Sequence, residues 1–189
     1  MLLTIFNPIQ YIPYSIDKNS EGFIIANIFQ NYKKPFNSVL KNYQLKNYRI
    51  KGSPRPEQLS HEIYGNSQLY WVLLMCNDVY DPFHGWIKPQ QACYDVADKK
   101  YPNAENLVLY HVNKQGSKFY NLVEYPVGSQ NWYDKGDKTR TYLQYKGPLS
   151  PVSAYEHEIA ENEKKRLIKI IPVNLIDSFI QDFIKEISL

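Results

Sequence analysis

Apolar and charged positions alternate early in the chain. Tyr48 and Ile50 fall on one side of the alternation, and Arg49 and Lys51 fall on the other. A period of two residues is typical of a strand with one buried face. The pattern therefore predicts a strand over residues 45–51, which leads into the most informative stretch of the chain, residues 48–88.

Two helices are predicted directly after this strand. Ser53 before Pro54 indicates a helix start, because a side-chain acceptor suits the N-cap and proline suits the first helical position. Gly65 can close that helix in the left-handed conformation. Ser67 can cap the next helix, which is apolar on nearly every side up to Cys76. A helix without a polar face is buried by its neighbours, so this one is predicted to form the centre of the domain.

The N-terminal quarter carries two weaker patterns. Residues 1–22 are expected to form an extended, apolar arm. Residues 23–42 show apolar positions at helical spacing, which predicts a helix that stops before Pro35. A second short helix is possible over residues 36–43.

The middle of the chain predicts a helix over residues 90–100 and a pair of strands over residues 107–112 and 118–123. Residues 126–151 are rich in Gly, Pro, Asn, Asp and Tyr. This composition predicts a long loop, either ordered or flexible, and loops of that length usually make functional contacts or are disordered.

The C-terminal part begins with a capping box, since Ser153 is followed three residues later by Glu156. The pattern predicts a charged helix to about Lys165, then a strand over residues 166–171. In the last segment, residues 173–189, apolar residues recur every three or four positions, which is typical of an amphipathic helix. Its apolar stripe can face the core or a partner.

Composition adds one unusual feature to an ordinary soluble protein. Apolar residues make up 43% of the chain and charged residues 22%, whereas aromatic residues reach 15%, with 17 Tyr. Tyr joins a large contact face to a polar tip, so its excess is compatible with extensive interfaces. Biased codon usage is an equally good explanation, because Asn, Lys and Ile are plentiful too.

The net charge of +3 is unevenly distributed. Residues 1–55 contain eight basic and two acidic residues, a net +6, so the remainder carries −3. The asymmetry suggests either a solvated basic face, which is commoner, or head-to-tail contact between subunits. The chain has no Arg-rich run and no Gly-rich RNA-binding pattern, so a nucleic-acid partner is not predicted.

The two cysteines, Cys76 and Cys93, do not form a CxxC pair, and each lies in a predicted helix. They are expected to be buried thiols of a protein made in a reducing compartment. The N-terminal segment lacks a basic n-region and is interrupted by Pro8 and Pro13, and no stretch approaches about twenty uninterrupted apolar residues. We therefore expect no membrane partner, and use in the cytoplasm or in a particle assembled there.

No catalytic, cofactor or metal site is predicted. The four histidines are far apart and lack HxxxH or HExxH spacing, and no GxSxG, P-loop or GxGxxG motif occurs. Asp78 and Asp81 flank a turn and could form a carboxylate pair, as in glycoside hydrolysis. Helix-terminating and turn-forming roles are much commoner for aspartates in such positions.

Two tryptophans, Trp71 and Trp86, allow a choice between a core role and a binding role. Trp71 is predicted to lie in the core. Trp86, in a Gly-Trp turn, could stack on a sugar ring, fill a pocket on a partner protein, or simply cover the end of the domain core, which is the default for this residue type.

The stretch from Tyr48 resembles a LysM module, a two-stranded antiparallel sheet with two helices on one side. The resemblance rests on a strand Tyr-x-Ile, a Gly-Ser turn, a helix ending in Tyr-Gly, a second helix ending in Asn, and a strand ending in Ile-Pro: residues 48–50, 52–53, 64–65, 77 and 171–172. The closing strand fits residues 167–172 far better than anything just after Asn77. The resemblance therefore implies a LysM-like core interrupted by an insertion.

The whole chain closely resembles the small baseplate wedge subunit of T-even-type contractile-tailed phages. The blocks that carry this resemblance are YRIKGSPRPEQL (48–59), IYGNSQLYWVLLMCND (63–78), YDPFHGWI (80–87), YDKGDK (133–138), YEHEIAENEKKR (155–166) and IKII (168–171). The resemblance implies a structural, non-catalytic part of the virion tail baseplate, assembled in the host cytoplasm. Its expected partners are other wedge proteins, including copies of itself in adjacent wedges, and it is expected to help wedges join around the hub.

The expected fold is therefore α+β. Its expected parts are an N-terminal arm with short helices, a LysM-like core, an insertion with helix, β-hairpin, long loop and charged helix, and a C-terminal helix: residues 1–47, 48–89 with 166–172, 90–165, and 173–189. Aromatic residues and Arg are the usual anchors of interfaces, so the predicted protein-interface residues are Arg55, Tyr64, Phe83 and Trp86.

Two alternatives stay open. The same core could bind peptidoglycan or N-acetylglucosamine polymers through residues 52–56 and 77–82. Sugar-binding LysM modules commonly read Gly-Asp-Thr or Gly-Asp-Ser in the first turn, whereas this chain reads GSPRP (52–56), and two prolines stiffen the loop beside the usual sugar groove. A lytic enzyme acting through Asp78, Asp81 or Glu62 is a distant third hypothesis.

Overall fold

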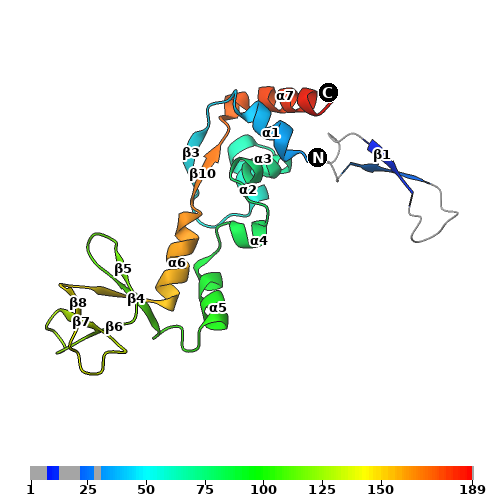
Figure 1. Cartoon of the computed structure of the whole chain (residues 1–189). Coiled ribbons are helices and arrows are strands. Elements are labelled where there is room, and N and C mark those ends of the chain that lie inside the picture. The colour runs from blue at the N-terminus through cyan, green and yellow to red at the C-terminus, as the bar shows by residue number, and fades with distance from the viewer. Residues whose placement is uncertain (1–7, 13–21, 28–30, 189) are drawn as a thin grey trace. The chain divides into compact units, whose positions relative to one another are not determined.

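The computed structural model describes residues 8–12, 22–27 and 31–188 (Figure 1). Helices and small antiparallel sheets make up these residues, so the predicted α+β class is confirmed. Contacts divide the chain into two compact units, one of Met1–Ile87 with Lys165–Leu189 and one of Lys88–Lys164. The first unit is thus built from two separate pieces of sequence. No helix among the described residues has the length and apolar character needed to cross a membrane.

The two-stranded sheet of the first unit joins strands that are far apart in the sequence. Strands β3 (Lys46–Arg49) and β10 (Leu167–Ile170) pair antiparallel, with Leu167 opposite Arg49 and Ile170 opposite Lys46. The predicted pairing of these two strands is therefore confirmed. Ile50, just beyond β3, is 1% exposed, whereas Arg49 is exposed, as the alternating pattern predicted.

Helices α2 (Pro56–Tyr64) and α3 (Tyr70–Cys76) follow β3, joined by the 3-10 turn Ser67–Leu69. The predicted helix starts at Ser53 and Ser67 are wrong. Arg55 is the N-cap of α2, with Pro56 at the first helical position, where a missing N–H costs nothing. Asn66 caps the 3-10 turn, because its side chain accepts a hydrogen bond from the Gln68 N–H.

The end of α2 follows the prediction. Gly65 adopts a φ of 69°, a left-handed conformation that a residue with a Cβ reaches only with strain. Its N–H donates to the His61 carbonyl, which would otherwise be unpaired at the helix end. The chain then turns into the 3-10 segment and α3.

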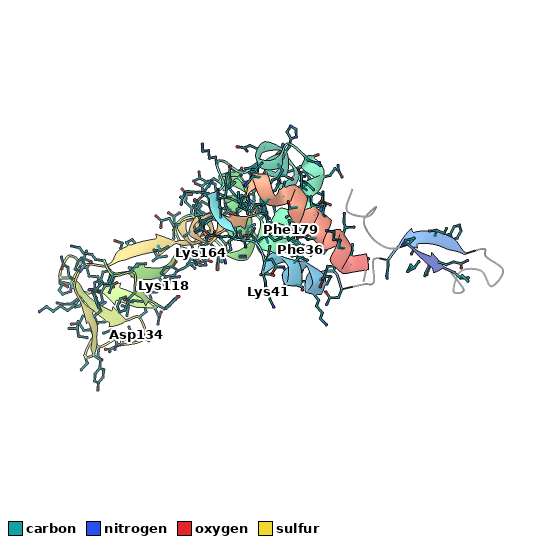
Figure 2. All side chains as sticks on the ribbon, turned by 90° about the horizontal axis from the view of Figure 1, so that it is seen from above. Phe36, Lys41, Lys118, Asp134, Lys164 and Phe179 are labelled. Carbon is teal, nitrogen blue, oxygen red and sulfur yellow. The ribbon has the colours of Figure 1, made fainter. Side chains whose placement is uncertain are left out.

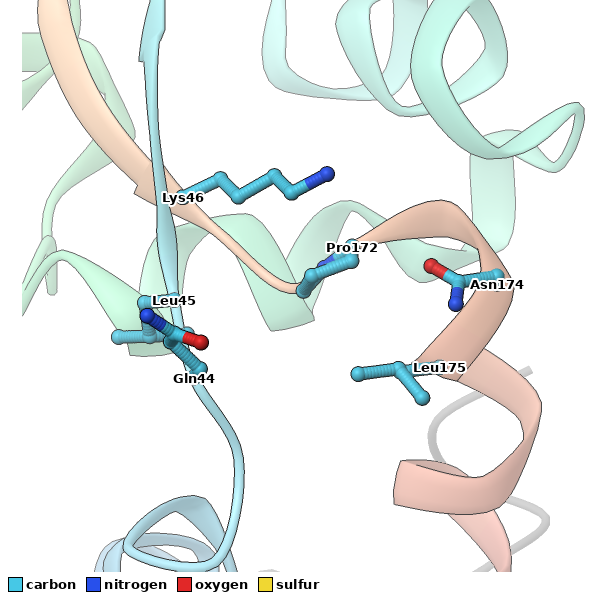
Figure 3. Close-up of a pocket in the computed structure, with 6 residues that line it drawn as sticks. All are labelled: Gln44, Leu45, Lys46, Pro172, Asn174 and Leu175. Atoms are coloured by element: carbon cyan, nitrogen blue, oxygen red, sulfur yellow. The ribbon is translucent and has the colours of Figure 1, made fainter.

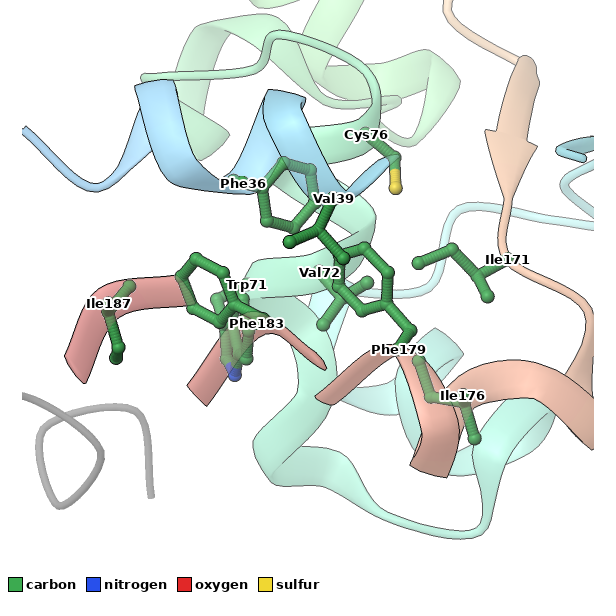
Figure 4. Packing of buried hydrophobic residues seen from close by; sticks show 10 residues of the cluster. All are labelled: Phe36, Val39, Trp71, Val72, Cys76, Ile171, Ile176, Phe179, Phe183 and Ile187. Atoms are coloured by element: carbon green, nitrogen blue, oxygen red, sulfur yellow. The ribbon is translucent and has the colours of Figure 1, made fainter. Parts of the chain in front are cut away.

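Helices α1 (Lys33–Leu40), α3 and α7 (Ile176–Ser188) share one apolar core (Figure 4). Phe36, Phe179 and Phe183 are 0% exposed. The Phe36 ring lies 5.1 Å from Phe179 and 5.8 Å from Phe183, both edge to face, an arrangement that aromatic quadrupoles favour. Figure 2 labels Phe36 and Phe179 where α1 and α7 meet. Trp71, 4% exposed, packs into the same core, as predicted.

A second core lies beneath the two-stranded sheet. Inward side chains of the sheet pack on α2, α3 and the turn after the short helix α4 (Pro82–Gly85). Its buried members are Ile50, Leu59, Leu73, Leu74, Trp86, Ile87, Ile168 and Ile170. The sheet therefore has one apolar, buried face and one solvent-facing side.

The N-terminal prediction needs correction. Phe23–Ala26 is strand β2, which pairs antiparallel with β1 (Pro8–Tyr11), and is not helical. The first helix begins at Lys33 and contains Pro35 in its first turn, where N–H groups have no intrahelical acceptor, so proline is tolerated. The rest of the predicted arm lies outside the described residues.

In the second unit, α5 (Gln90–Lys100) packs against α6 (Ala154–Lys164). The capping box predicted for α6 is confirmed, since Glu156 N–H donates to Ser153 Oγ at 3.2 Å and Ser153 N–H to Glu156 Oε2 at 2.7 Å. Asn162, 7% exposed, joins α6 to the start of the unit by two hydrogen bonds with the Lys88 main chain.

Two small sheets complete the second unit. The first has the order β5-β4-β9 and the second the order β6-β7-β8. Their strands are β4 (Val108–Val112), β5 (Lys118–Phe119), β6 (Leu122–Glu124), β7 (Asn131–Asp134), β8 (Leu143–Lys146) and β9 (Ser150–Ser153). The segment 126–151 contains β7, β8 and the start of β9, and turns and loops make up the rest, so the prediction of a single long loop is only partly right. The predicted strand over 118–123 is divided into β5 and β6.

Candidate protein interface

The loop of residues 77–86 follows α3 and ends at Trp86 in the second core. Two aspartates fix its conformation. Asp78 has a φ of 54°, and its Oδ1 forms an ion pair with Lys33 Nζ at 2.7 Å. The same Lys33 ammonium donates to the Met75 carbonyl at the end of α3. A cation at a helix C-terminus also interacts favourably with the helix dipole. Asp78 therefore anchors the exit of α3.

Asp81 fixes the second half of the loop. Its Oδ1 accepts hydrogen bonds from the Phe83 N–H at 2.8 Å and the His84 N–H at 3.3 Å, which makes it the N-cap of α4. The His84 ring bonds to the other carboxylate oxygen. This bond, together with the backbone N–H groups, holds the pKa of Asp81 below its usual value. Both aspartates thus have the turn-forming role that their sequence positions favour.

The rigid loop presents two exposed aromatic side chains, which we call the 77–86 aromatic pair. Tyr80 is 79% exposed and Phe83 is 78% exposed. Because capping already fixes the loop, a partner that binds these rings orders little further backbone and loses little conformational entropy. Large exposed aromatics on a rigid support are typical of protein interfaces.

The four predicted interface residues lie in different environments. Phe83 is exposed, and Arg55 is exposed at the start of α2, where its N–H donates to the Gln58 side chain. Tyr64 is half-buried between the two cores, and its hydroxyl donates to the Ile171 carbonyl at 3.1 Å. Burial raises the pKa of Tyr64. Tyr64 therefore supports the fold from inside.

Trp86 is 3% exposed and belongs to the second core. Its Nε1–H donates to the Pro54 carbonyl at 2.8 Å. The ring covers the end of the domain core, which was the default interpretation of this residue. It also ties residues 52–56 to the 77–86 loop.

The turn at residues 52–56 is fastened by side chains. Arg166 Nη1 donates to the Ile50 carbonyl at 2.9 Å and to the Gly52 carbonyl at 2.8 Å, and Trp86 Nε1 donates to the Pro54 carbonyl. Three carbonyls in and beside this turn, those of Ile50, Gly52 and Pro54, are therefore already engaged by the protein itself.

A second group of exposed apolar residues lies in the second unit. Its members are Tyr120, Tyr125, Val127, Tyr142 and Leu143, which are between 46% and 91% exposed. The Arg140 guanidinium lies 3.5 Å from the centroid of the Tyr125 ring, a cation–π contact. Sequence reasoning missed these residues individually. For Val127, Tyr142 and Leu143 the signal was present only in the composition of the segment 126–151, whereas Tyr120 and Tyr125 precede that segment.

The loop between β7 and β8 that carries Tyr142 is organised by Asp137. Its carboxylate accepts hydrogen bonds from the N–H groups of Thr139, Thr141 and Tyr142, the last at 2.9 Å. These donors hold the pKa of Asp137 below its usual value. The loop is thus a formed structure that displays Tyr142.

Two observations on the described residues concern thiol and metal chemistry. Burial raises the pKa of Cys76 to about 12, so its thiol stays protonated, and nucleophilic chemistry needs the thiolate. Among residues 8–12, 22–27 and 31–188, no three His, Cys, Asp or Glu side chains are arranged to hold a metal ion.

A shallow groove of about 290 Å³ lies where β3 begins and the chain enters α7 (Figure 3). The residues that line it are Gln44, Leu45, Lys46, Pro172, Asn174 and Leu175. Leu45, Pro172 and Leu175 give it an apolar floor of modest size.

Comparison with known proteins gives two concordant results. The sequence profile of a family described as Base plate wedge protein 53 matches residues 1–186. The chain is 52% identical over 186 residues to Baseplate wedge protein gp53 of Enterobacteria phage T4, which covers 98% of this chain and 95% of that protein. Both matches span the two units and the C-terminal helix. The chain belongs to the Base plate wedge protein 53 family.

Proposed function

We propose that the chain works as a structural connector in the tail baseplate, by docking on neighbouring wedge subunits. Membership of the family makes it a baseplate wedge protein and a component of the virion tail. The single observation that carries the proposal is the match over nearly the whole chain, which includes every exposed aromatic surface described above. A catalytic role is not part of the proposal.

The first unit is the proposed scaffold, a LysM-like core that holds interface loops. The pairing of β3 with β10 and the packing of α2 and α3 beneath them support this assignment. The fastened turn at residues 52–56 supports protein docking over sugar binding, because the carbonyls of Gly52 and Pro54 are occupied. Residues 90–165 would then be an insertion that adds contact surface.

The 77–86 aromatic pair and Arg55 are the proposed contacts in the first unit, while Tyr64 and Trp86 hold these contacts in place from within. Neighbouring wedge proteins are the proposed partners, together with copies of this chain in adjacent wedges. When a partner covers exposed Tyr and Phe side chains, their apolar area is removed from water, which stabilises the complex. Such anchors supply most of the binding energy in protein interfaces.

The proposal is tested by baseplate assembly with and without the protein. Omitting it should leave wedges that do not join, seen by sedimentation and electron microscopy. Replacing both Tyr80 and Phe83 by Ala should lower the yield of complete baseplates, since truncated hot spots typically cost about 2 kcal/mol or more. Val173→Ala, at another exposed position of the first unit, is the matched control. Intact baseplates in the absence of the protein would overturn the proposed function.

A further inference from the structure

The two edges of the β3/β10 sheet differ in how their main-chain groups are satisfied. On the β10 side, the Asn77 side chain acts like one residue of a further strand. Its Nδ2–H donates to the Lys169 carbonyl at 2.8 Å, and its Oδ1 accepts from the Lys169 N–H at 2.7 Å. This edge is therefore covered by the protein itself at Lys169, in the middle of β10.

The β3 edge has no such cover. The Ile50 N–H donates to the Arg166 carbonyl at 2.9 Å, and this register directs the main-chain groups of alternate residues toward β10. Those of Asn47 and Arg49 point the other way. Within the described part of the chain, no hydrogen bond satisfies the N–H or C=O of either residue, and both residues are exposed. An open edge of this kind is a template for an added strand.

The two segments that form this sheet carry charge of a single sign, and the nearest carboxylates come from other elements, Glu62 beside Tyr48 and Asp78 beside Asn47 and Lys169. No Asp or Glu occurs within residues 22–56 or within residues 164–176, the segments that contain both strands. The outward side of the sheet carries Arg49, Lys51 and Lys169, all exposed. Among the described residues, none of these three cations forms an ion pair. Such a surface attracts acidic groups and repels a strand of its own kind.

The groove of Figure 3 lies at the first residue of β3. Lys46 lines it together with Leu45 and Leu175, so a strand running along the edge would reach a site for one apolar side chain at this end. The groove and the open edge thus share the start of β3.

We propose that an acidic, extended segment of a neighbouring baseplate protein adds to the sheet as a third strand, on the open edge of β3. Its main chain bonds to Asn47 and Arg49, its carboxylates at alternate positions lie beside Arg49 and Lys51, and one apolar side chain enters the groove. A second copy of β3 is excluded as the added strand, because Arg49 and Lys51 would face like charges. The inference rests on the proposed function and specifies one of its contacts.

Substitutions at the edge test the main-chain and charge components separately. Asn47→Pro removes an outward N–H without touching the ladder to β10, and Asn47→Thr keeps that N–H as a control. Arg49→Glu with Lys51→Glu reverses the charge, with Lys41→Glu, at an exposed position beyond α1, as its control. We expect incorporation into baseplates to fall at least about tenfold for Asn47→Pro and for the double variant Arg49→Glu with Lys51→Glu. The two controls, Asn47→Thr and Lys41→Glu, should be incorporated like the wild type.

Hydrogen exchange in the wild-type protein gives a test that does not depend on how the variants fold. The amides of Asn47 and Arg49 should exchange rapidly in the free protein and become protected in assembled baseplates, read residue by residue by mass spectrometry. Equal exchange in both states, with the wild type incorporated, would overturn this inference alone. A wild type that never enters baseplates would overturn the proposed function and the inference with it.

Discussion

At the scale of single residues, Trp86 illustrates how a tertiary contact decides between interpretations. A Gly-Trp turn is compatible with a sugar platform, a partner anchor or a core cover. The hydrogen bond from Nε1 to the Pro54 carbonyl and an exposure of 3% select the core cover. Pro54 lies far from Trp86 in sequence, so no local pattern could reveal this bond. Phe83, three residues earlier, is the aromatic that reaches the surface.

Replacing Trp86 by Ala should lower the free energy of unfolding of the first unit by about 3 to 5 kcal/mol, because a large buried ring leaves a cavity. Trp86→Phe should cost less, since it mainly removes the hydrogen bond to Pro54. Urea titration followed by circular dichroism measures both. Phe83→Ala is the matched control and should stay within about 0.5 kcal/mol of wild type. A loss for Phe83→Ala as large as that for Trp86→Ala would refute the assignment.

His111 is a second residue whose role only the structure discloses. Its ring lies 4.6 Å from that of Trp132, between the two small sheets of the second unit, and no described residue bonds to its buried Nδ1. Burial, followed by the nearby positive charge of Lys135, lowers the pKa of His111. The folded second unit therefore binds a proton at this site less readily than the unfolded chain does.

This lowered pKa predicts that stability is fully present above the unfolded pKa of about 6.5 and is lost as the pH falls through it toward the folded value. His111→Gln should remove part of this dependence. The measurement is the melting temperature of wild type and variant between about pH 8 and about pH 5. His61→Gln, the same substitution at an exposed position, is the control. Parallel profiles for wild type and His111→Gln would contradict the prediction.

At the scale of elements, prediction succeeded where a helix or strand carries a long, regular pattern. The stripe of α7 lies in the core at Ile176, Phe179, Phe183 and Ile187, while Ile184 is 39% exposed at its margin. Most of the apolar stripe of α7 therefore faces the core and not a partner. Spacing every three or four residues suffices to define such a face, since it follows from helix geometry alone.

Phe183→Ala should therefore destabilise the first unit by about 3 to 5 kcal/mol, because the ring is fully buried against α1 and α3. Ile184→Ala changes the neighbouring residue of the same helix at a partly exposed site, and it should cost less than half as much. Chemical denaturation followed by tyrosine and tryptophan fluorescence reports both. Equal losses for the two variants would show that α7 docks through a different face.

Short elements were the ones that prediction missed. Strands β7 and β8 lie within a segment rich in turn-forming residues, and each has only four residues. Trp132, 8% exposed, donates from Nε1 to the Gly147 carbonyl at 2.9 Å and holds these strands to the following turn. Brief strands are stabilised by such neighbours more than by their own propensity, so tertiary context overrides composition.

At the scale of the whole molecule, the division into two units follows from one strand pairing. Strand β3 finds its partner β10 only after the chain has passed through Lys88–Lys164. Helix α7 then returns to pack on α1. The first unit is therefore discontinuous in sequence, whereas the second is continuous.

Fragments should reflect this difference. Residues 88–164 produced alone should fold, because their helices and both small sheets are complete within the fragment. Residues 1–87 alone should remain unfolded, since they lack β10 and α7. Dispersion of amide resonances in two-dimensional NMR spectra distinguishes the two states. Adding residues 165–189 in trans should restore the dispersion of the first fragment, and a folded 1–87 fragment on its own would contradict this account.

The sequence by itself determined the α+β class, the alternating face of β3, the buried helix α3, the stripe of α7 and membership of the wedge protein family, because local periodicity and long matching blocks need no three-dimensional information. The tertiary structure alone decided that Trp86 is buried, that Tyr80 and Phe83 are exposed, and that one edge of the sheet is capped while the other is open. These features depend on residues that are distant along the chain, such as Asn77 with Lys169 and Trp86 with Pro54, and are brought together only by folding.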